Sequence, residues 1–208
     1  MQSHRSFAAL VPALVVGLTA CDRGSTKDDA SSSVIENLVV QAPAIDFPLP
    51  DFTLTDQNKN LVKRADLEGK VWVASFIFTS CPSICPRLTK RKATMQEALL
   101  GNDDVRFVSI SVDPETDTPE KLSEFATKHG ATSARWLFLT GDPKVVDATV
   151  LTGFKMVLQR STPGSVDISH AERFCVVDRK AHVRGLFDTS DEGLTALKAR
   201  VAELRAEK

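Results

Sequence analysis

An almost unbroken apolar run, rich in β-branched and aromatic residues, extends from Val71 to Phe78. A strand with one wet face alternates between apolar and polar residues, so a continuous run predicts a strand that is buried on both faces at the centre of a sheet. A segment of helix-forming residues follows from Arg87 to Leu100, and Pro86 before it suits the first turn of a helix. The pattern therefore predicts a central strand, a short turn and a helix.

Strand and helix patterns alternate along the rest of the chain. The predicted elements are, in chain order, a hairpin at 52–55 and 61–63, the central strand and its helix, strand 105–112, helix 118–129, strand 136–140, helix 141–151, a short strand 154–158, a polar loop 160–169, strands 173–178 and 182–187, and helix 191–207. This alternation predicts a parallel core with right-handed crossovers, and the tight turn between the last two strands makes that pair antiparallel. The expected fold is α/β, with flanking helices around a central mixed sheet that carries an N-terminal β-hairpin.

The N-terminus has the pattern of a targeting segment. Basic residues lead, and the apolar stretch behind them is shorter than the roughly 20 residues that span a membrane, so residues 1–20 are expected to be a cleaved signal. The sequence Leu-Thr-Ala-Cys that ends at Cys21 resembles a bacterial lipoprotein signal, in which the cysteine becomes the lipidated first residue. Asp22 resembles the signal that retains such lipoproteins at the inner membrane. An ordinary export signal, with Cys21 as a free thiol, is the alternative.

Composition sets the domain organisation. Residues 21–45 include a small, polar stretch without hydrophobic period and are expected to form a flexible tether, which leaves residues 46–208 as one folded domain. The chain of 208 residues has a formal net charge of −1, which gives no electrostatic reason to expect nucleic-acid binding. Its four cysteines are too few for a disulfide framework, so their positions matter more than their number.

Two of these cysteines, Cys81 and Cys85, lie in the turn between the central strand and the helix. Four residues of spacing bring both sulfurs to one face if the turn is already helical, and the positive end of the helix dipole favours thiolates. Single cysteines are usually small core residues, but two prolines hold this pair at an exposed turn. The pair is thus expected to be a soft-metal site or a redox pair.

His170 is the histidine that this topology could bring to the pair. If the strand 173–178 lies antiparallel beside the central strand, its beginning sits next to the other strand's end, and His170 faces Cys81 and Cys85. The alternative is a histidine in an exposed loop without a ligand role. Three other side chains are expected to have structural positions: Cys175 in the core, His182 at the surface and His129 at a helix C-terminus.

Three motifs in this order resemble the Sco/SenC family of thioredoxin-fold copper proteins. They are Phe78-Thr79-Ser80-Cys81-Pro82-Ser83-Ile84-Cys85-Pro86, then Ser111-Val112-Asp113-Pro114-Glu115 with Asp117-Thr118-Pro119, then Ser169-His170 followed by a strand and Val183-Arg184-Gly185. The resemblance covers about Phe47 to the C-terminus. This chain departs from the family in Ala181, where a glycine is frequent, and in its lipoprotein-like signal, where a membrane helix is usual.

The resemblance implies a thioredoxin-like three-layer fold and a function. It implies a copper chaperone tethered to the periplasmic side of the bacterial inner membrane, with copper held by Cys81, Cys85 and His170. The expected partner is the copper-bearing subunit of cytochrome c oxidase, whose dinuclear copper site it helps to assemble, or another copper or thiol protein. Two thiolates and an imidazole suit copper, and three ligands leave an open position for transfer.

An enzyme activity remains open from the sequence alone. Cys81 and Cys85 could instead be the catalytic pair of a thiol–disulfide reductase that acts on the oxidase cysteines or on another periplasmic substrate. Their spacing differs from the C-x-x-C of thioredoxins, which weakens this interpretation. A peroxiredoxin is disfavoured because no proline between Pro50 and Pro82 could form a peroxide-binding motif. His170 separates the alternatives, since copper binding requires it and thiol exchange does not.

Overall fold

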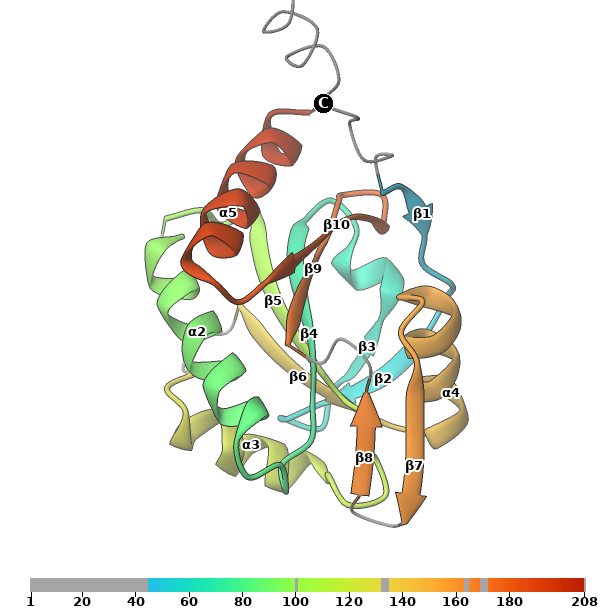
Figure 1. The fold of residues 1–208 in the computed structure, drawn as a ribbon. Helices are drawn as coiled ribbons and strands as arrows, with labels where there is room; N and C mark the ends of the chain where they lie inside the picture. Colours follow the sequence, from blue (N-terminus) through green and yellow to red (C-terminus); the bar gives the residue numbers. More distant parts are fainter. Residues whose placement is uncertain (1–44, 100, 132–134, 163–164, 169–171, 208) are drawn as a thin grey trace, which may run out of the picture. The chain divides into compact units, whose positions relative to one another are not determined.

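The computed structural model describes residues 45–99, 101–131, 135–162, 165–168 and 172–207 (Figure 1). The strands are β1 (Phe47–Pro48), β2 (Thr53–Asp56), β3 (Leu61–Lys63), β4 (Val71–Ile77), β5 (Val105–Ser111), β6 (Trp136–Thr140), β7 (Leu158–Thr162), β8 (Ser165–Ile168), β9 (Arg173–Val177) and β10 (His182–Asp188). The helices are the 3-10 helix η1 (Arg64–Leu67), α2 (Ile84–Ala98), α3 (Pro119–Lys128), α4 (Pro143–Asp147), the π-helix η2 (Ala148–Gly153) and α5 (Asp191–Ala206).

Eight strands form one mixed sheet in the order β1-β10-β9-β4-β5-β6-β2-β3. The pairs β4–β5 and β5–β6 are parallel, as the alternation of strands and helices predicts, and the outer pairs are antiparallel. All seven residues of β4 are buried, so the apolar run at Val71 is indeed a central strand covered on both faces. The predicted hairpin, β2 with β3, forms one edge of the sheet.

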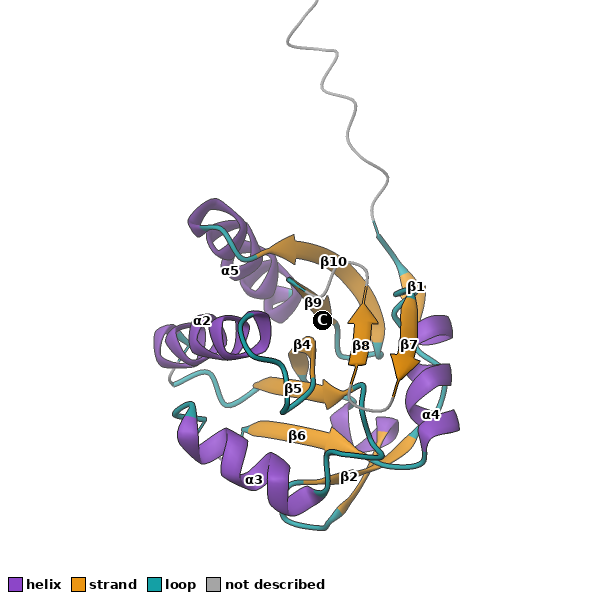
Figure 2. Ribbon diagram, turned by 60° about the horizontal axis from the view of Figure 1, so that its bottom comes forward, coloured by secondary structure: helices purple, strands orange, loops and turns teal. Residues whose placement is uncertain are grey.

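Helices cover both faces of the sheet, which gives three layers (Figure 2). One face of the sheet packs under α2, α3 and α5 in a core that includes Val73, Met95 and Leu197. The other face packs against α4, η1 and η2 in a core that includes Trp72 and Val150. The residues of β4 alternate between these two cores, because successive side chains of a strand point to opposite faces.

The segment after η2 differs from the prediction. The predicted strand at 154–158 is wrong, since the chain from Phe154 to Val157 is irregular and β7 begins at Leu158. The predicted polar loop at 160–169 is also wrong over most of its length, because β7 and β8 pair as a separate two-stranded antiparallel sheet. This sheet lies outside the main sheet, so its strands lack the long apolar run that marks a buried strand.

The pairing of β9 with β4 is the part of the topology on which the expected metal site depends. The two strands are antiparallel, with the partners Trp72↔Val177, Val73↔Val176 and Ala74↔Cys175. The beginning of β9 therefore lies toward the end of β4, from which the chain continues to the cysteines. This confirms the antiparallel arrangement predicted from the sequence.

Candidate metal or dithiol centre

The turn between β4 and α2 brings the two cysteines together. Helix α2 begins at Ile84, close to the start that Pro86 predicts, so Cys85 lies in its first turn and Cys81 precedes it. The Cys81 N–H donates to the carbonyl of Phe78 at 3.2 Å, and the Cys85 N–H donates to the Cys81 sulfur at 3.3 Å. A free N–H at the start of a helix is thus satisfied by a thiol.

The cysteine side chains are less accessible than the turn that carries them. Pro82 and Ser83 are exposed, as expected, but Cys81 and Cys85 are only 8% and 2% exposed and pack into the core beneath α2. Both are free thiols in the structure. The two cysteines are therefore as buried as core residues, although they lie just beyond the C-terminal end of the central strand β4.

The two thiols have opposite tendencies to ionise. Burial raises the pKa of Cys81, but the backbone amides of the first helical turn, led by that of Cys85, together outweigh burial and lower it. Burial raises the pKa of Cys85 to about 12, and its neighbour Cys81 adds to this effect. The expectation that the helix terminus favours both thiolates holds for Cys81 and is wrong for Cys85, because burial dominates there.

A buried carboxylate holds the turn in place. Asp117 is 0% exposed, and it accepts hydrogen bonds from the Thr79 N–H at 3.0 Å, the Thr79 hydroxyl at 2.5 Å and the Ser111 hydroxyl at 2.6 Å. Burial raises the pKa of Asp117, although these hydrogen bonds oppose it. The carboxylate ties the end of β4 to the end of β5, just ahead of Cys81. The sequence placed Asp117 in a motif but did not reveal its partners.

A second carboxylate lies nearby in the same loop. Asp113 is 4% exposed, and its Oδ2 is buried without a hydrogen-bond partner in the described part of the chain. Its N–H donates to the Ser111 hydroxyl at 3.1 Å, and its carbonyl accepts from the Asp117 N–H at 2.8 Å. The loop after β5 thus puts two buried acidic side chains at the carboxyl edge of the parallel strands, where α/β sheets usually bind ligands.

The third expected ligand, His170, lies outside the described residues. The nearest described residue after it, Glu172, forms an ion pair with Arg87, which stands two positions after Cys85 on α2. Within the described ranges, no group of three or more His, Cys, Asp and Glu side chains is arranged to hold a metal ion. The structure thus brings Cys81 and Cys85 together and leaves the position of His170 as a prediction.

The other cysteines and histidines named from the sequence lie away from the dithiol or outside the described residues. Cys175 is fully buried in β9, which confirms its place in the core. His129 is the C-cap of α3, and its ring packs 4.4 Å from that of Phe125. His182 is half-buried, and its Nδ1 lies 2.7 Å from the carboxylate of Asp46. Cys21 lies outside the described residues. None of the helices in the described ranges is long and apolar enough to span a bilayer.

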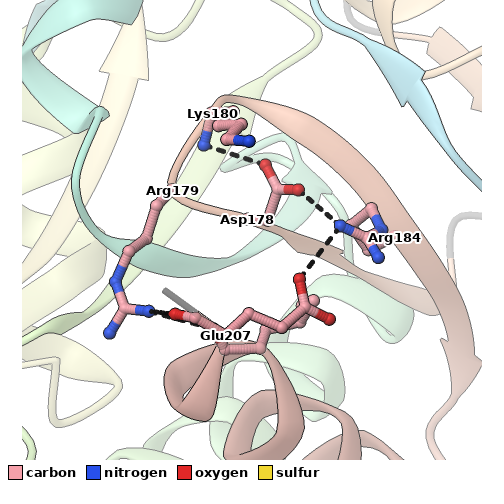
Figure 3. A pocket seen from close by; sticks show the side chains of 6 residues that line it. Asp178, Arg179, Lys180, Arg184 and Glu207 are labelled. Atoms are coloured by element: carbon pink, nitrogen blue, oxygen red, sulfur yellow. Dashed lines mark hydrogen bonds and ion pairs between the residues drawn. The ribbon is translucent and has the colours of Figure 1, made fainter.

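A polar pocket lies at the turn between β9 and β10 and the end of α5 (Figure 3). The ribbon places this turn and the end of α5 at the opposite end of the sheet from the β4–α2 turn (Figure 1). Arg184 pairs there with Asp178 at 2.7 Å and with Glu207 at 3.4 Å. Arg179 donates to the carbonyl of Glu207 at 2.7 Å. These contacts pair the charges with one another and fasten the end of α5 to the sheet, so the pocket has a structural role.

The family model for SCO1/SenC matches residues 46–205, which is most of the chain. The chain belongs to the SCO1/SenC family. Among its relatives is the SCO1 protein homolog of Bacillus subtilis, which is 35% identical over 135 residues, 64% of this chain and 69% of the relative. Cys81, Cys85 and Asp117 lie in the part of the chain that the family model covers.

Solved Sco structures share the fold. A SCO1/SenC family lipoprotein from Bacillus anthracis is 28% identical with a TM-score of 0.72, covering 78% of this chain and 98% of that one. BsSco, described with a disulfide switch and as a member of a family of cytochrome c oxidase assembly proteins, is 29% identical with a TM-score of 0.71, covering 80% and 98%. Bradyrhizobium japonicum ScoI with copper bound is 26% identical with a TM-score of 0.62, covering 74% and 99%. The fold is thus the thioredoxin-like α/β fold of the Sco family.

Proposed function

We propose that this Sco protein is a copper metallochaperone that binds one copper ion through Cys81, Cys85 and His170. The observation that carries the proposal is the close packing of the two cysteines at the β4–α2 turn, where the Cys85 N–H reaches the Cys81 sulfur. Thiolates select soft ions such as cuprous copper, and an imidazole completes a trigonal site. The related ScoI from Bradyrhizobium japonicum has been solved with copper bound, which supports the same cargo here.

Two observations support the proposal that His170 approaches the dithiol. The antiparallel register directs the start of β9 toward the end of β4, and the Arg87–Glu172 ion pair fastens the chain just after His170 to the first turns of α2. Two residues of extended chain span at most about 7 Å. The residue two positions after His170 thus contacts the helix that carries Cys85, which supports the proposed role of His170 as the third ligand.

The partner and the location extend the same proposal. Copper delivered by this protein would enter the dinuclear site of a cytochrome c oxidase, since BsSco is described among the assembly proteins of that oxidase. Cys21 would carry the lipid that anchors the protein at the periplasmic side of the inner membrane, with residues 21–45 as tether. The relative from Bacillus anthracis is described as a lipoprotein.

A second candidate function is thiol–disulfide exchange on the oxidase cysteines or another periplasmic substrate. The unequal thiols favour it: a lowered pKa at Cys81 suits an attacking thiolate, and a buried Cys85 with a pKa of about 12 suits a resolving thiol. The disulfide switch described for BsSco is consistent with such chemistry. Both functions use the same sulfurs, so His170 decides between them.

The deciding experiment compares variants of the reduced protein. We expect one copper(I) per chain in the wild type, a severe loss of affinity in His170→Ala, and no binding in Cys81→Ser or Cys85→Ser. His182→Ala and Cys175→Ser are matched controls, because these side chains have other partners or lie in the core. Unchanged copper affinity in His170→Ala, together with intact disulfide reductase activity, would instead assign the reductase function.

A further inference from the structure

The helix that carries Cys85 also carries a lysine that is buried in the core. Lys92 lies on α2 seven residues after Cys85, which is about two helical turns and places both on one face of the helix. It is 0% exposed. Among the residues that the structure describes, no carboxylate forms an ion pair with it, although lysine is rarely buried without such a partner.

Neutral groups surround the Lys92 ammonium. Its Nζ donates to the Ser75 hydroxyl of β4 at 2.9 Å, and to the Val108 carbonyl at 2.5 Å and the Ser109 hydroxyl at 3.3 Å in β5. An ammonium has three donors, so these three acceptors satisfy it. A neutral amine fits as well, because either serine hydroxyl can turn and donate to its lone pair. The cluster can therefore hold the lysine with or without its proton.

Among the described residues on the other elements around Lys92, one titratable group, Cys175, acts on it. The Trp136 ring of β6 lies 5.5 Å from Nζ, in a position that attracts a cation. The Cys175 thiol of β9 also acts on Lys92, but its own pKa of about 12 keeps it neutral near pH 7. The buried face of α5 is apolar. Burial lowers the pKa of Lys92 well below its usual range, because the charged form loses its hydration in the core.

Lys92 also joins the two elements that carry the cysteines. It fastens α2, whose first turn contains Cys85, to β4, whose end leads to Cys81. Side chains on a helix lean toward its N-terminus, so the amine lies on the side of α2 that is nearer to Cys85. A positive charge at that place favours negative charge at the start of the helix.

We propose that Lys92 is a positioning and charge-compensating residue for the dithiol, which takes up a proton when the cysteines become thiolates or bind copper(I). The part of this inference that concerns copper binding rests on the proposed function. Binding of Cu⁺ to two thiols releases two protons and leaves an anionic copper dithiolate, and Lys92 would retain part of one of these protons within the protein. Seven residues of helix rise by about 10 Å. Two unit charges about 10 Å apart interact, at the effective dielectric of proteins, strongly enough to change a binding constant about tenfold.

The test measures copper(I) affinity against a chromophoric chelator between pH 6 and 8.5. Lys92→Met and Lys92→Gln are expected to bind copper(I) about tenfold more weakly at neutral pH. Their affinity should also rise more steeply with pH than that of the wild type, because all released protons then leave the protein. Lys90→Met is the matched control, since Lys90 is exposed on the same helix and lies closer to Cys85. A uniform loss of affinity with an unchanged pH slope, or no loss, would overturn the proposal.

A measurement without copper separates this inference from the proposed function. Oxidation of the dithiol by glutathione disulfide forms one Cys81–Cys85 disulfide and two glutathione thiols, which take the two electrons and two protons. Above the pKa of Cys81, where the reduced dithiol carries a thiolate, loss of the cation should shift this equilibrium toward the protein disulfide by up to about tenfold, or about 30 mV in midpoint potential. If the wild type bound no copper but Lys92→Met still shifted this equilibrium, the proposed function would fail and the role of Lys92 would stand. An equilibrium identical in Lys92→Met, Lys92→Gln and Lys90→Met would reject that role.

Discussion

At the scale of single residues, the site depends on polar side chains that the core has buried. Asp117 fastens Thr79 and Ser111, and we expect Asp117→Ala to lower the free energy of unfolding by about 1–3 kcal/mol, because buried donors lose their acceptor. Copper affinity should fall as well, since Thr79 leads directly to Cys81. Urea unfolding with Glu115→Ala as control measures the first effect. Equal stability of the two variants would contradict the role of Asp117 in the turn.

Lys92 gives a prediction about pH and stability. Its pKa in the folded protein is lowered, so the unfolded chain binds more protons between that pKa and about 10.4, and stability rises with pH across this window. Lys92→Met removes the cost of burying the charge. The variant should therefore be more stable by about 1–4 kcal/mol at pH below that window, with a gain that shrinks toward pH 10. Unfolding curves at several pH values measure it, and a gain that is independent of pH would contradict the explanation.

Residue identity alone could not reveal these partners. The spacing of Cys81 and Cys85 and the helix start near Pro86 depend on neighbours in the chain, so the sequence could place both cysteines in one turn. The contacts of Asp117 and Lys92 join residues that are 6 to 38 positions apart. Such contacts follow from strand order and register, which the sequence pattern does not determine.

At the scale of elements, α5 holds its face of the sheet through one apolar stripe. Leu197 on this stripe is 0% exposed, and Leu197→Ala is expected to cost about 2–5 kcal/mol in unfolding free energy through lost burial and a cavity. Leu151→Ala, at a position that is 45% exposed, should cost much less. Thermal or urea unfolding compares them. A cost of Leu197→Ala as small as the one expected for Leu151→Ala would mean that α5 contributes little to the core.

Elements with a strong hydrophobic period were predictable, and those without it were not. The apolar run of β4 and the stripe of α5 result from burial, so their positions agree with the sequence prediction. Strands β7 and β8 form their own small sheet outside the main one, and no such run marks them. The π-helix η2 likewise has no sequence signature that distinguishes it from the end of an α-helix.

At the scale of the whole molecule, anchoring and copper binding should be separable. If Cys21 carries the lipid and residues 46–208 bind copper, the Cys21→Ser protein should no longer be found in the membrane fraction of the bacterium. Its copper affinity should be unchanged. Fractionation and labelling with a fatty acid measure the first effect, and chelator competition measures the second. Continued fatty-acid labelling of Cys21→Ser would contradict the lipoprotein assignment.

The central claim is that two sulfurs and one imidazole nitrogen meet on a single copper ion. X-ray absorption spectroscopy of the reduced, copper(I)-loaded protein tests this most directly, because it distinguishes sulfur from nitrogen ligands at the metal. We predict two sulfur ligands and one imidazole nitrogen in the wild type and in His182→Ala, and loss of the nitrogen in His170→Ala. A spectrum with sulfur ligands alone in the wild type, or an unchanged nitrogen contribution in His170→Ala, would contradict the proposed copper site.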